Sequence, residues 1–173
     1  LEYRKDSKTF AWGGKYFDNM NQRTTVFTEL GVLEEDPPTV PSTYQDSRII
    51  FLANSHPNIQ IDFLNQFPNR VLAVADTMDL WIDIARNELN ELFKHIDGLI
   101  INDSEATQLT DLENPIEAAK ELIAHGPNFV IVKKGEHGAI IVHPDGEFVL
   151  PAFELQPSEV VDPTGAGDSF AGG

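Results

Sequence analysis

The sequence predicts an α/β sandwich in which helices pack against a mainly parallel sheet, with a small β region ahead of it. Short, continuous apolar runs recur along residues 48–143, and a buried parallel strand requires such runs. Segments whose apolar residues have helical spacing alternate with these runs, as in α/β folds. The N-terminal residues instead place aromatic and β-branched residues around glycines, a composition that favours strands.

The first 47 residues are expected to hold part of a β sheet and a connection. The stretch TFAWGGKYFDN places two apolar-aromatic runs around Gly13-Gly14, which is a hairpin signal. RTTVFTEL at 23–30 indicates a further strand, because β-branched residues favour that state. Residues 31–47 are acidic and rich in proline, so we interpret them as a connection. The expected parts are therefore 1–30, 31–47 and an α/β core over 48–173.

Strands and helices alternate through this core. The predicted strands are 48–53, 70–75, 97–101, 129–134 and 139–143. The predicted helices are 58–67, 80–96, a short one at 104–109, and one that begins at Asn114-Pro115 and stops at Gly126-Pro127. The helix at 80–96 would turn one apolar face inward, made of Trp81, Ile84, Ala85, Leu89, Leu92 and Ile96. Only GEHG separates the last two strands, so we expect that pair to be antiparallel.

Composition excludes several classes of protein. The chain has 12 basic and 28 acidic residues, a net charge of −16, and no basic stripe, so we expect no nucleic-acid partner. The apolar runs are about five residues long, too short to span a membrane. The chain has no cysteine, which excludes disulfides, thiolate metal sites and cysteine nucleophiles, and which fits a cytoplasmic protein.

Polar side chains follow four of the predicted strands. Asn54, Asp76 and Asn102 come directly after the first three strands of the core, and Lys133-Lys134 close the fourth. In open parallel sheets, ligands bind beyond the carboxyl ends of the strands. Asn and Asp are also common turn residues, and for each position alone this ordinary explanation is the stronger one. Their joint placement nevertheless points to a binding site at that edge.

The stretch VVDPTGAGDSF holds a second candidate site. Gly165, Ala166 and Gly167 have little or no side chain, so a ligand can approach their backbone N–H groups. If they start a helix, these groups form an anion site at its positive end. Asp168 then falls in the first turn, where it could accept the proton of a hydroxyl that attacks a phosphorus atom. The alternative is a glycine-rich loop that only connects a strand to a helix.

Three motifs resemble those of one family. VVDPTGAGDSFAGG is similar to the C-terminal signature of the ribokinase-like carbohydrate kinases of the phosphofructokinase-B type. NDSE at 102–105 resembles the N-x-x-E motif of that family, and KKGEHG at 133–138 resembles its nucleotide-binding strand and turn. The resemblance covers about residues 9–173 and implies a three-layer sandwich with a β lid at its N-terminus.

The resemblance implies specific roles. It implies that Asp168 is the base and that the anion hole consists of Gly165, Ala166 and Gly167. Glu105 would organise Mg²⁺ through water, with Asn102 near the phosphates of ATP. Its other implied contacts are Lys133, Gly135 and Gly138 for the nucleotide, and Asp162 and Thr164 for a monovalent cation such as K⁺. Without the resemblance, Glu105 could equally be a carboxylate at a helix N-terminus, and Lys133 a solvated lysine at a strand end.

The sequence also departs from the family pattern. DTMDLW at 76–81 stands where many members carry D-x-N-x-R, so only Asp76 matches and the substrate subclass stays open. The N-terminal third of the family and the segment after the last glycines lack a counterpart. We therefore expect part of an ATP- and Mg²⁺-dependent sugar kinase, with a nucleoside kinase or a non-catalytic nucleotide-binding fragment as alternatives. The 173-residue chain itself is expected to be inactive and to self-associate, for instance as a homodimer.

Overall fold

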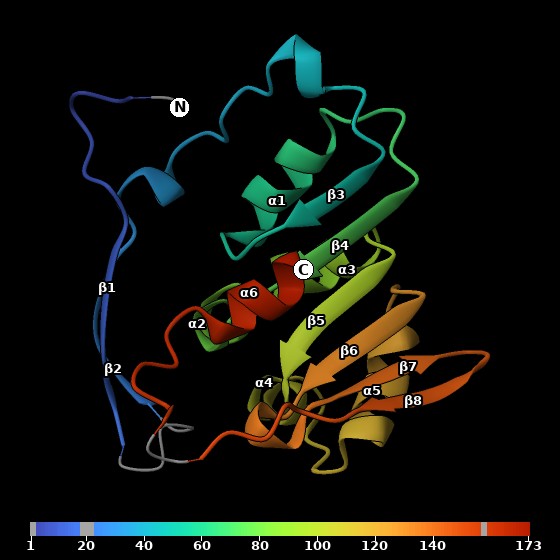
Figure 1. Ribbon diagram of the computed structural model, residues 1–173. Helices are drawn as coiled ribbons and strands as arrows, with labels where there is room; N and C mark the ends of the chain where they lie inside the picture. The colour runs from blue at the N-terminus through green and yellow to red at the C-terminus, as the bar shows by residue number, and fades with distance from the viewer. Residues whose placement is uncertain (1–2, 18–22, 157–158) are drawn as a thin grey trace.

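The computed structural model describes residues 3–17, 23–156 and 159–173. These residues form a six-stranded sheet and a separate two-stranded sheet. Figure 1 shows the two-stranded sheet standing to one side of the main sheet. The strands are β1 (Ala11–Tyr16), β2 (Arg23–Glu29), β3 (Ile49–Leu52), β4 (Leu72–Asp76), β5 (Gly98–Asn102), β6 (Phe129–Lys133), β7 (Ala139–His143) and β8 (Gly146–Leu150).

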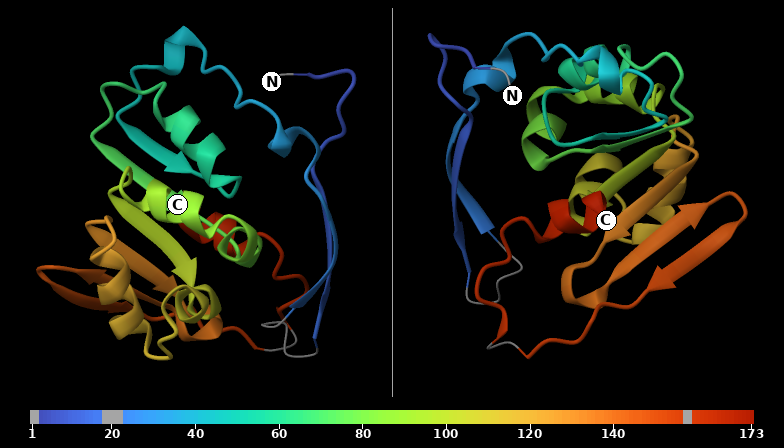
Figure 2. Two further views of the ribbon diagram at one scale, coloured as in Figure 1. Left: turned by 180° about the vertical axis from the view of Figure 1, so that it is seen from behind. Right: turned by 45° about the horizontal axis from the view of Figure 1, so that its top comes forward.

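Helices lie on both faces of the main sheet. Helices α1, α3 and α5 cover one face, and α6 lies on the other (Figures 1 and 2). The helices are α1 (Pro57–Leu64), α2 (Asp79–Ile84), α3 (Arg86–Phe93), α4 (Asp103–Thr110), α5 (Pro115–Ile123) and α6 (Ala166–Gly172). Within the part of the chain that the structure describes, no helix is long and apolar enough to cross a membrane.

The order of the main sheet follows the sequence from β3 to β8. Strands β3, β4, β5 and β6 are parallel. Strand β7 then pairs antiparallel with β6, as the short GEHG connection predicts. Strand β8 continues antiparallel and forms the edge, and the sequence reasoning missed it. Its side chains are mostly exposed, so the strand lacks the continuous apolar run that marked the others.

The predicted helix 80–96 is wrong as a single element. It is two helices that meet at Ala85, whose backbone is not helical (φ −136°, ψ 38°). The break changes which side chains reach the core, and Ile84 is 64% exposed although the periodicity placed it inside. Trp81 packs with Met78 and Ala85 in a small cluster of its own, whereas Leu89 and Leu92 join the main core.

The predicted turn at Gly13-Gly14 is also wrong. Both glycines lie inside β1, which pairs with β2 from Ala11 opposite Glu29 to Tyr16 opposite Arg23, with a register shift between the two glycines. Aromatic packing explains why they are glycines. A Cβ at Gly13 would lie 2.3 Å from the ring of Phe27, and one at Gly14 would lie 2.2 Å from the ring of Trp12. The residues that connect the two strands include 18–22, which lie outside the described residues.

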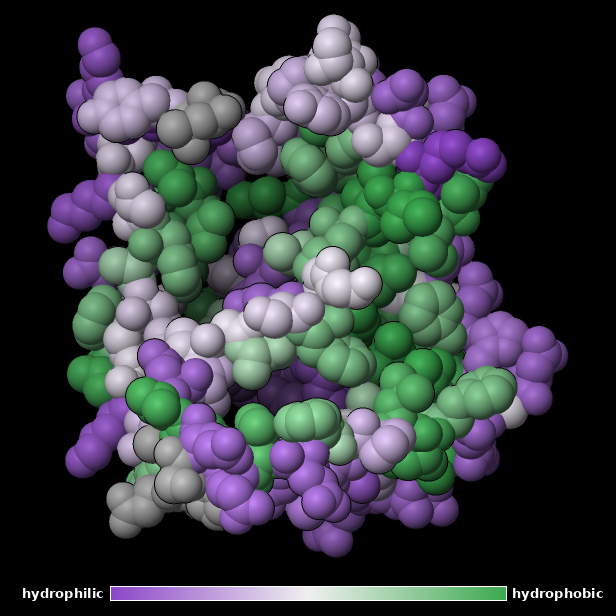
Figure 3. Space-filling view, in the orientation of Figure 1, coloured by the Kyte–Doolittle hydropathy of each residue, from purple (hydrophilic) through white to green (hydrophobic). Residues whose placement is uncertain are grey.

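The core lies between the main sheet and the helices of one face. Strand β5 is buried at its first four positions, and Leu99 and Ile101 are fully enclosed. Gly98 begins this strand because a Cβ there would lie 2.2 Å from the ring of Phe129 in β6. In the view of Figure 3 the opposite face, which carries α6, shows extensive apolar surface around that helix. The sheet is therefore densely packed on one face and only partly covered on the other.

Candidate active site

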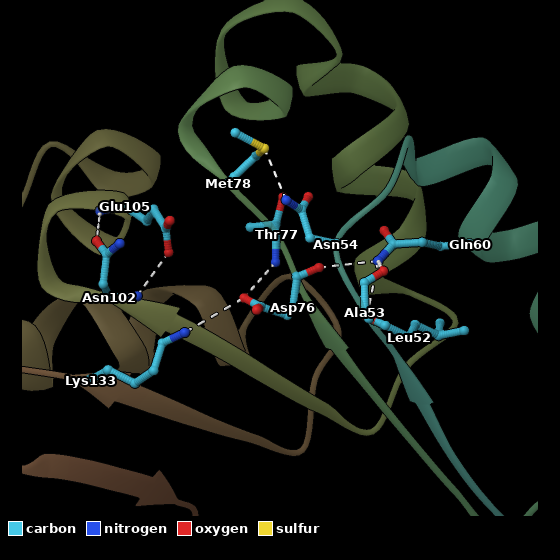
Figure 4. Close-up of polar contacts among 10 residues, drawn as sticks. All are labelled: Leu52, Ala53, Asn54, Gln60, Asp76, Thr77, Met78, Asn102, Glu105 and Lys133. Atoms are coloured by element: carbon cyan, nitrogen blue, oxygen red, sulfur yellow. Dashed lines mark hydrogen bonds and ion pairs between the residues drawn. The ribbon is translucent and has the colours of Figure 1, made fainter. Parts of the chain in front are cut away.

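The carboxyl ends of β4, β5 and β6 bring three of the predicted residues together. Asn102 and Lys133 are opposite one another in the register of β5 and β6. The Nζ atom of Lys133 lies 3.8 Å from Oδ1 of Asp76, the last residue of β4 (Figure 4). Since neighbouring parallel strands end at the same edge, the topology alone is enough to gather these side chains.

Asn54 lies at the end of β3, but its side chain is used to hold α2. Its Oδ1 atom accepts a hydrogen bond from Nε1 of Trp81 at 2.8 Å. Its Nδ2 atom contacts the sulfur of Met78 at 2.9 Å (Figure 4). The oxygen and the nitrogen of the Asn54 amide therefore both contact the segment that follows β4. We interpret Asn54 as a residue that holds α2 against the end of β3.

Asn102 and Glu105 form a capping box at the start of α4. The Oδ1 atom of Asn102 accepts a hydrogen bond from the backbone N–H of Glu105, and Oε2 of Glu105 accepts one from the backbone N–H of Asn102, both at 2.8 Å. Such reciprocal bonds satisfy two orphan donors of a helix N-terminus. The explanation of Glu105 as a helix-terminal carboxylate is thus correct for one of its oxygens, and the second oxygen takes no part in the box.

Burial dominates the electrostatics of Glu105. The residue is 6% exposed, and desolvation raises the pKa of its carboxyl to about 7. The N–H of Asn102 and the ammonium of Lys133 oppose this rise, while the charges of Asp76 and Asp79 add to it. A nearby cation would favour the ionised form, because an opposite charge stabilises a buried carboxylate.

Asp76 is the buried acid at the centre of this edge. Its Oδ1 atom accepts a hydrogen bond from the backbone N–H of Thr77 at 2.8 Å and also faces Lys133. Burial raises the pKa of Asp76, Lys133 and the N–H of Thr77 lower it, and the charge of Asp168 raises it further. The last effect shows that Asp168, from the far end of the sequence, lies within electrostatic reach of the end of β4.

The glycine turn opens helix α6, as the sequence predicts, but the predicted anion-hole donor of Ala166 is used within the turn, because its N–H donates to the carbonyl oxygen of Pro163 at 3.1 Å. Gly165 is the N-cap of α6 with φ 81°, a left-handed conformation that suits glycine, and Asp168 lies in the first turn. A Cβ at Gly165 would meet no atom within 4 Å, so the turn faces open space. A Cβ at Gly167 would lie 3.1 Å from Nζ of Lys133, so this end of α6 sits directly over that ammonium.

The two glycines of the KKGEHG segment shape the turn between β6 and β7. Gly135 begins a short 3₁₀ turn with φ 55°, and Gly138 ends it with φ 82°. A Cβ at Gly138 would lie 1.9 Å from the carbonyl oxygen of Leu150, so this position has a packing reason to be glycine. Both glycines lie at the same end of β6 as Lys133, beside the edge described above.

Asp162 and Thr164 are joined by a hydrogen bond in the loop before α6. The Oδ1 atom of Asp162 accepts a hydrogen bond from the backbone N–H of Thr164 at 2.9 Å. Bonding to Thr164, from its side chain and its backbone, lowers the pKa of Asp162. The hydroxyl of Thr164 also donates to the hydroxyl oxygen of Tyr16 at 3.2 Å, which joins the loop before α6 to β1. Among the described residues, no group of three or more His, Cys, Asp or Glu side chains is placed to hold a metal.

Gln60 is a residue that the sequence reasoning missed. It is 2% exposed, and its Nε2 atom lies 3.1 Å from the carbonyl oxygens of Leu52, Ala53 and Asp76 (Figure 4). Its amide thereby ties the carboxyl end of β3 to that of β4. In the sequence Gln60 is only a polar residue in the predicted helix 58–67, and glutamine side chains are mostly exposed, so nothing indicates that it points inward.

The sequence of this chain matches a known protein family. Residues 65–173 match the family described as pfkB family carbohydrate kinase. The chain belongs to the pfkB family. The resemblance carried by the three motifs is therefore confirmed, and so is the α/β fold with a mainly parallel sheet.

Individual proteins and solved structures are also similar to this chain. A cytidine kinase of Thermococcus kodakarensis is 31% identical over 149 residues, which cover 84% of this chain and 53% of that protein. A ribokinase structure from Thermotoga maritima superposes with a TM-score of 0.73 at 24% identity, covering 98% of this chain and 56% of that one. A putative ribokinase II of E. coli, in complex with ATP and Mg²⁺, gives 0.73 at 18% identity, covering 96% and 56%. The chain spans about half the length of the curated relatives it matches.

Proposed function

We propose that this chain forms the nucleotide-binding and catalytic part of a kinase that transfers the γ-phosphoryl group of ATP to a hydroxyl of a sugar. The observation that carries the proposal is the open glycine turn before α6. In the first turn of α6 that follows, Gly167 lies beside Nζ of Lys133, and Asp168 is within electrostatic reach of Asp76. A hydroxyl acceptor and a phosphoryl donor can meet between these groups, which is the arrangement that phosphoryl transfer needs.

Asp168 acts as the general base in this proposal. Its carboxylate accepts the proton of the acceptor hydroxyl as that oxygen forms a bond to the γ-phosphorus, while the bond from this phosphorus to the bridging oxygen of ADP breaks. The backbone N–H groups of Gly165 and Gly167 are the proposed donors to the charge that develops on the phosphoryl oxygens, whereas the N–H of Ala166 already donates to the carbonyl oxygen of Pro163 at 3.1 Å. The products are a phosphate ester and ADP, and the proton passes from Asp168 to solvent.

Asn102 and Glu105 are the proposed residues for Mg²⁺ and the phosphates. Mg²⁺ prefers oxygen ligands and keeps several waters, so the oxygen of Glu105 outside the capping box fits a water-mediated contact. When bound, Mg²⁺ supplies positive charge that neutralises the phosphates. The structural neighbour that is in complex with ATP and Mg²⁺ supports the proposal of both cofactors for this chain. Gly135, Gly138 and Lys133 are the proposed contacts to the nucleotide.

The loop before α6 and the two-stranded sheet complete the proposal. Asp162 and Thr164 would contribute to a site for K⁺, for which their backbone carbonyls and side-chain oxygens are suitable ligands. Strands β1 and β2 would form a lid over the acceptor, since the Thr164–Tyr16 contact places β1 beside the loop that leads to Asp168. In this division residues 1–30 belong to the lid, 31–47 connect, and 48–173 form the core.

A nucleoside is the second candidate acceptor. The similarity to a cytidine kinase favours it, and the segment DTMDLW, which keeps only Asp76 of the D-x-N-x-R pattern, leaves the substrate subclass open. A third candidate, a non-catalytic nucleotide-binding fragment, is suggested by the chain spanning about half the length of its relatives. A panel of sugars and nucleosides, assayed by ADP release with the full-length gene product, separates the three.

The test of the catalytic role is Asp168→Asn in the full-length gene product. We expect turnover to fall about 10²- to 10⁴-fold, the usual contribution of a positioned base. The affinity for ATP should stay the same or improve, because a negative charge near phosphate is removed. Asp103→Asn is the matched control, since Asp103 is an exposed acid in the first turn of α4. Near-normal turnover of Asp168→Asn would remove the base from the proposal.

A further inference from the structure

Lys133 extends from the end of β6 into a space bounded by acids. Its side chain is 17% exposed and the side chain of Asp76 is 7% exposed, so the pair is largely withdrawn from solvent. The same ammonium also lies within electrostatic reach of Glu105. Burying a lysine is costly unless a charge compensates it, and the carboxylates of Asp76 at the end of β4 and of Glu105 in α4 provide this compensation.

The ammonium is held loosely enough to keep donors for a ligand. The distance of 3.8 Å from Nζ to Oδ1 of Asp76 is longer than a direct hydrogen bond, although it is short enough for strong attraction between the charges. A lysine ammonium has three N–H donors that can rotate. Asp76 spends part of its own hydrogen-bonding capacity on the N–H of Thr77, which fixes the carboxylate and leaves the ammonium free to turn.

The ammonium also lies close to the first turn of α6. A Cβ at Gly167 would lie 3.1 Å from Nζ of Lys133, so any side chain at this position would press on the ammonium. Lys133 therefore lies close both to the buried carboxylate of Asp76 and to the backbone of α6 at Gly167. A phosphoryl group placed against that turn, as in the proposed function, would be within reach of the Lys133 donors.

We propose that Lys133 contacts the transferred phosphoryl group, and that Asp76 is a positioning residue that holds the Lys133 ammonium beneath Gly167. This inference rests on the proposed function and adds two roles to it. A lysine side chain is flexible, and ordering it at the moment of reaction costs conformational entropy. Asp76 orders the side chain before the nucleotide arrives. A phosphoryl group that gains negative charge in the transition state is then met by a cation already in place.

The competing explanation is that Lys133 only neutralises a buried acid. In that case removing the lysine would lower stability without a selective effect on the chemical step. The two explanations predict different values of kcat for Lys133 variants. They also predict different coupling between substitutions at Lys133 and Asp76, and a different effect when arginine restores the positive charge.

The experiment uses a double-mutant cycle of Lys133→Met and Asp76→Asn in the full-length gene product. We expect Lys133→Met to lower kcat about 10²-fold with a smaller change in the KM for ATP, as for removal of a donor to developing charge. Asp76→Asn should lower kcat about 10-fold in the parent and have almost no effect in the Lys133→Met background, because it acts through the lysine. Lys133→Arg should restore part of kcat. Lys134→Met is the matched control, one residue further along, and should keep the parent kcat.

Melting temperatures separate folding from chemistry. Single variants leave one charge of the pair alone, whereas the double variant is neutral at both positions and should fold even if Asp76→Asn does not. Additive effects on kcat, or a Lys133→Met protein with the parent kcat and only a lower melting temperature, would overturn the inference. If the parent is active and Asp168→Asn is not, such a result leaves the proposed function standing. A parent that phosphorylates no acceptor overturns both.

Discussion

Replacing Glu105 with glutamine should make the folded protein more stable above neutral pH. Glutamine is nearly isosteric with glutamate, and at this position of α4 its side-chain oxygen can still accept the hydrogen bond from the backbone N–H of Asn102. The change therefore keeps the capping box and removes the titration. The difference in the free energy of unfolding between parent and Glu105→Gln therefore measures the cost of ionising this buried carboxyl in the folded protein.

The pKa of Glu105 sets the sign and size of this effect. Burial raises it to about 7 from the ordinary value of 4.5. Between these two pH values the folded state therefore binds more protons than the unfolded state. The contribution of Glu105 to stability is fully present below about pH 4.5 and is lost as the pH rises through about 7. The difference of 7 − 4.5 = 2.5 units corresponds to about 3 kcal/mol at 1.36 kcal/mol per unit.

Urea unfolding at about pH 4, 6 and 8 measures the effect. The free energies of unfolding of parent and Glu105→Gln should nearly coincide at the lowest pH and diverge by about 3 kcal/mol at the highest, with the variant more stable. Glu117→Gln is the matched control, because Glu117 occupies the same position of α5 behind its cap Asn114 but is exposed. Parallel pH profiles for the parent and Glu105→Gln would refute the argument, since they would mean that Glu105 ionises as easily in the folded chain as in the unfolded one.

Two further predictions concern packing and completeness. Gly98→Ala should lower the free energy of unfolding by about 1–3 kcal/mol, the usual cost of overpacking, because its Cβ would lie 2.2 Å from the ring of Phe129. The cost, measured by urea denaturation, should shrink in a Phe129→Leu background, and a Gly98→Ala chain as stable as the parent would contradict the contact. The 173-residue chain alone should release no ADP in the presence of sugar, as it spans about half the length of its relatives. Steady release that Asp168→Asn abolishes would show that this chain suffices.

The parallel core could be predicted because its signals are local. Each strand from β3 to β6 is a short apolar run, and Asn114-Pro115 marks the start of α5 by its own chemistry. In a parallel sheet the carboxyl ends of β4, β5 and β6 lie at the same edge. The sequence could therefore predict that Asp76, Asn102 and Lys133 lie close together. Their expected roles in catalysis stay predictions.

The errors arose where distant packing decides local structure. The glycines at 13–14 carry the signature of a turn, but they are glycines because aromatic rings lie over them. The break at Ala85 has no Pro or Gly to signal it, and it lies between Trp81, which packs in the small cluster, and Leu89, which packs in the main core. The inward amide of Gln60 likewise depends on carbonyl groups from two separate strands. Such contacts exist only after the chain has folded.

The two tryptophans of the chain give it two separate optical probes. Trp81 is 2% exposed and bonds to Asn54, so its fluorescence depends on the junction between the end of β3 and α2. Trp12 lies in β1, half-buried against the two-stranded sheet, with its Nε1 atom donating to the hydroxyl of Thr25 at 3.2 Å. Replacing either one leaves a single emitter, so movement of the two-stranded sheet and melting of the core can be recorded independently without an attached dye.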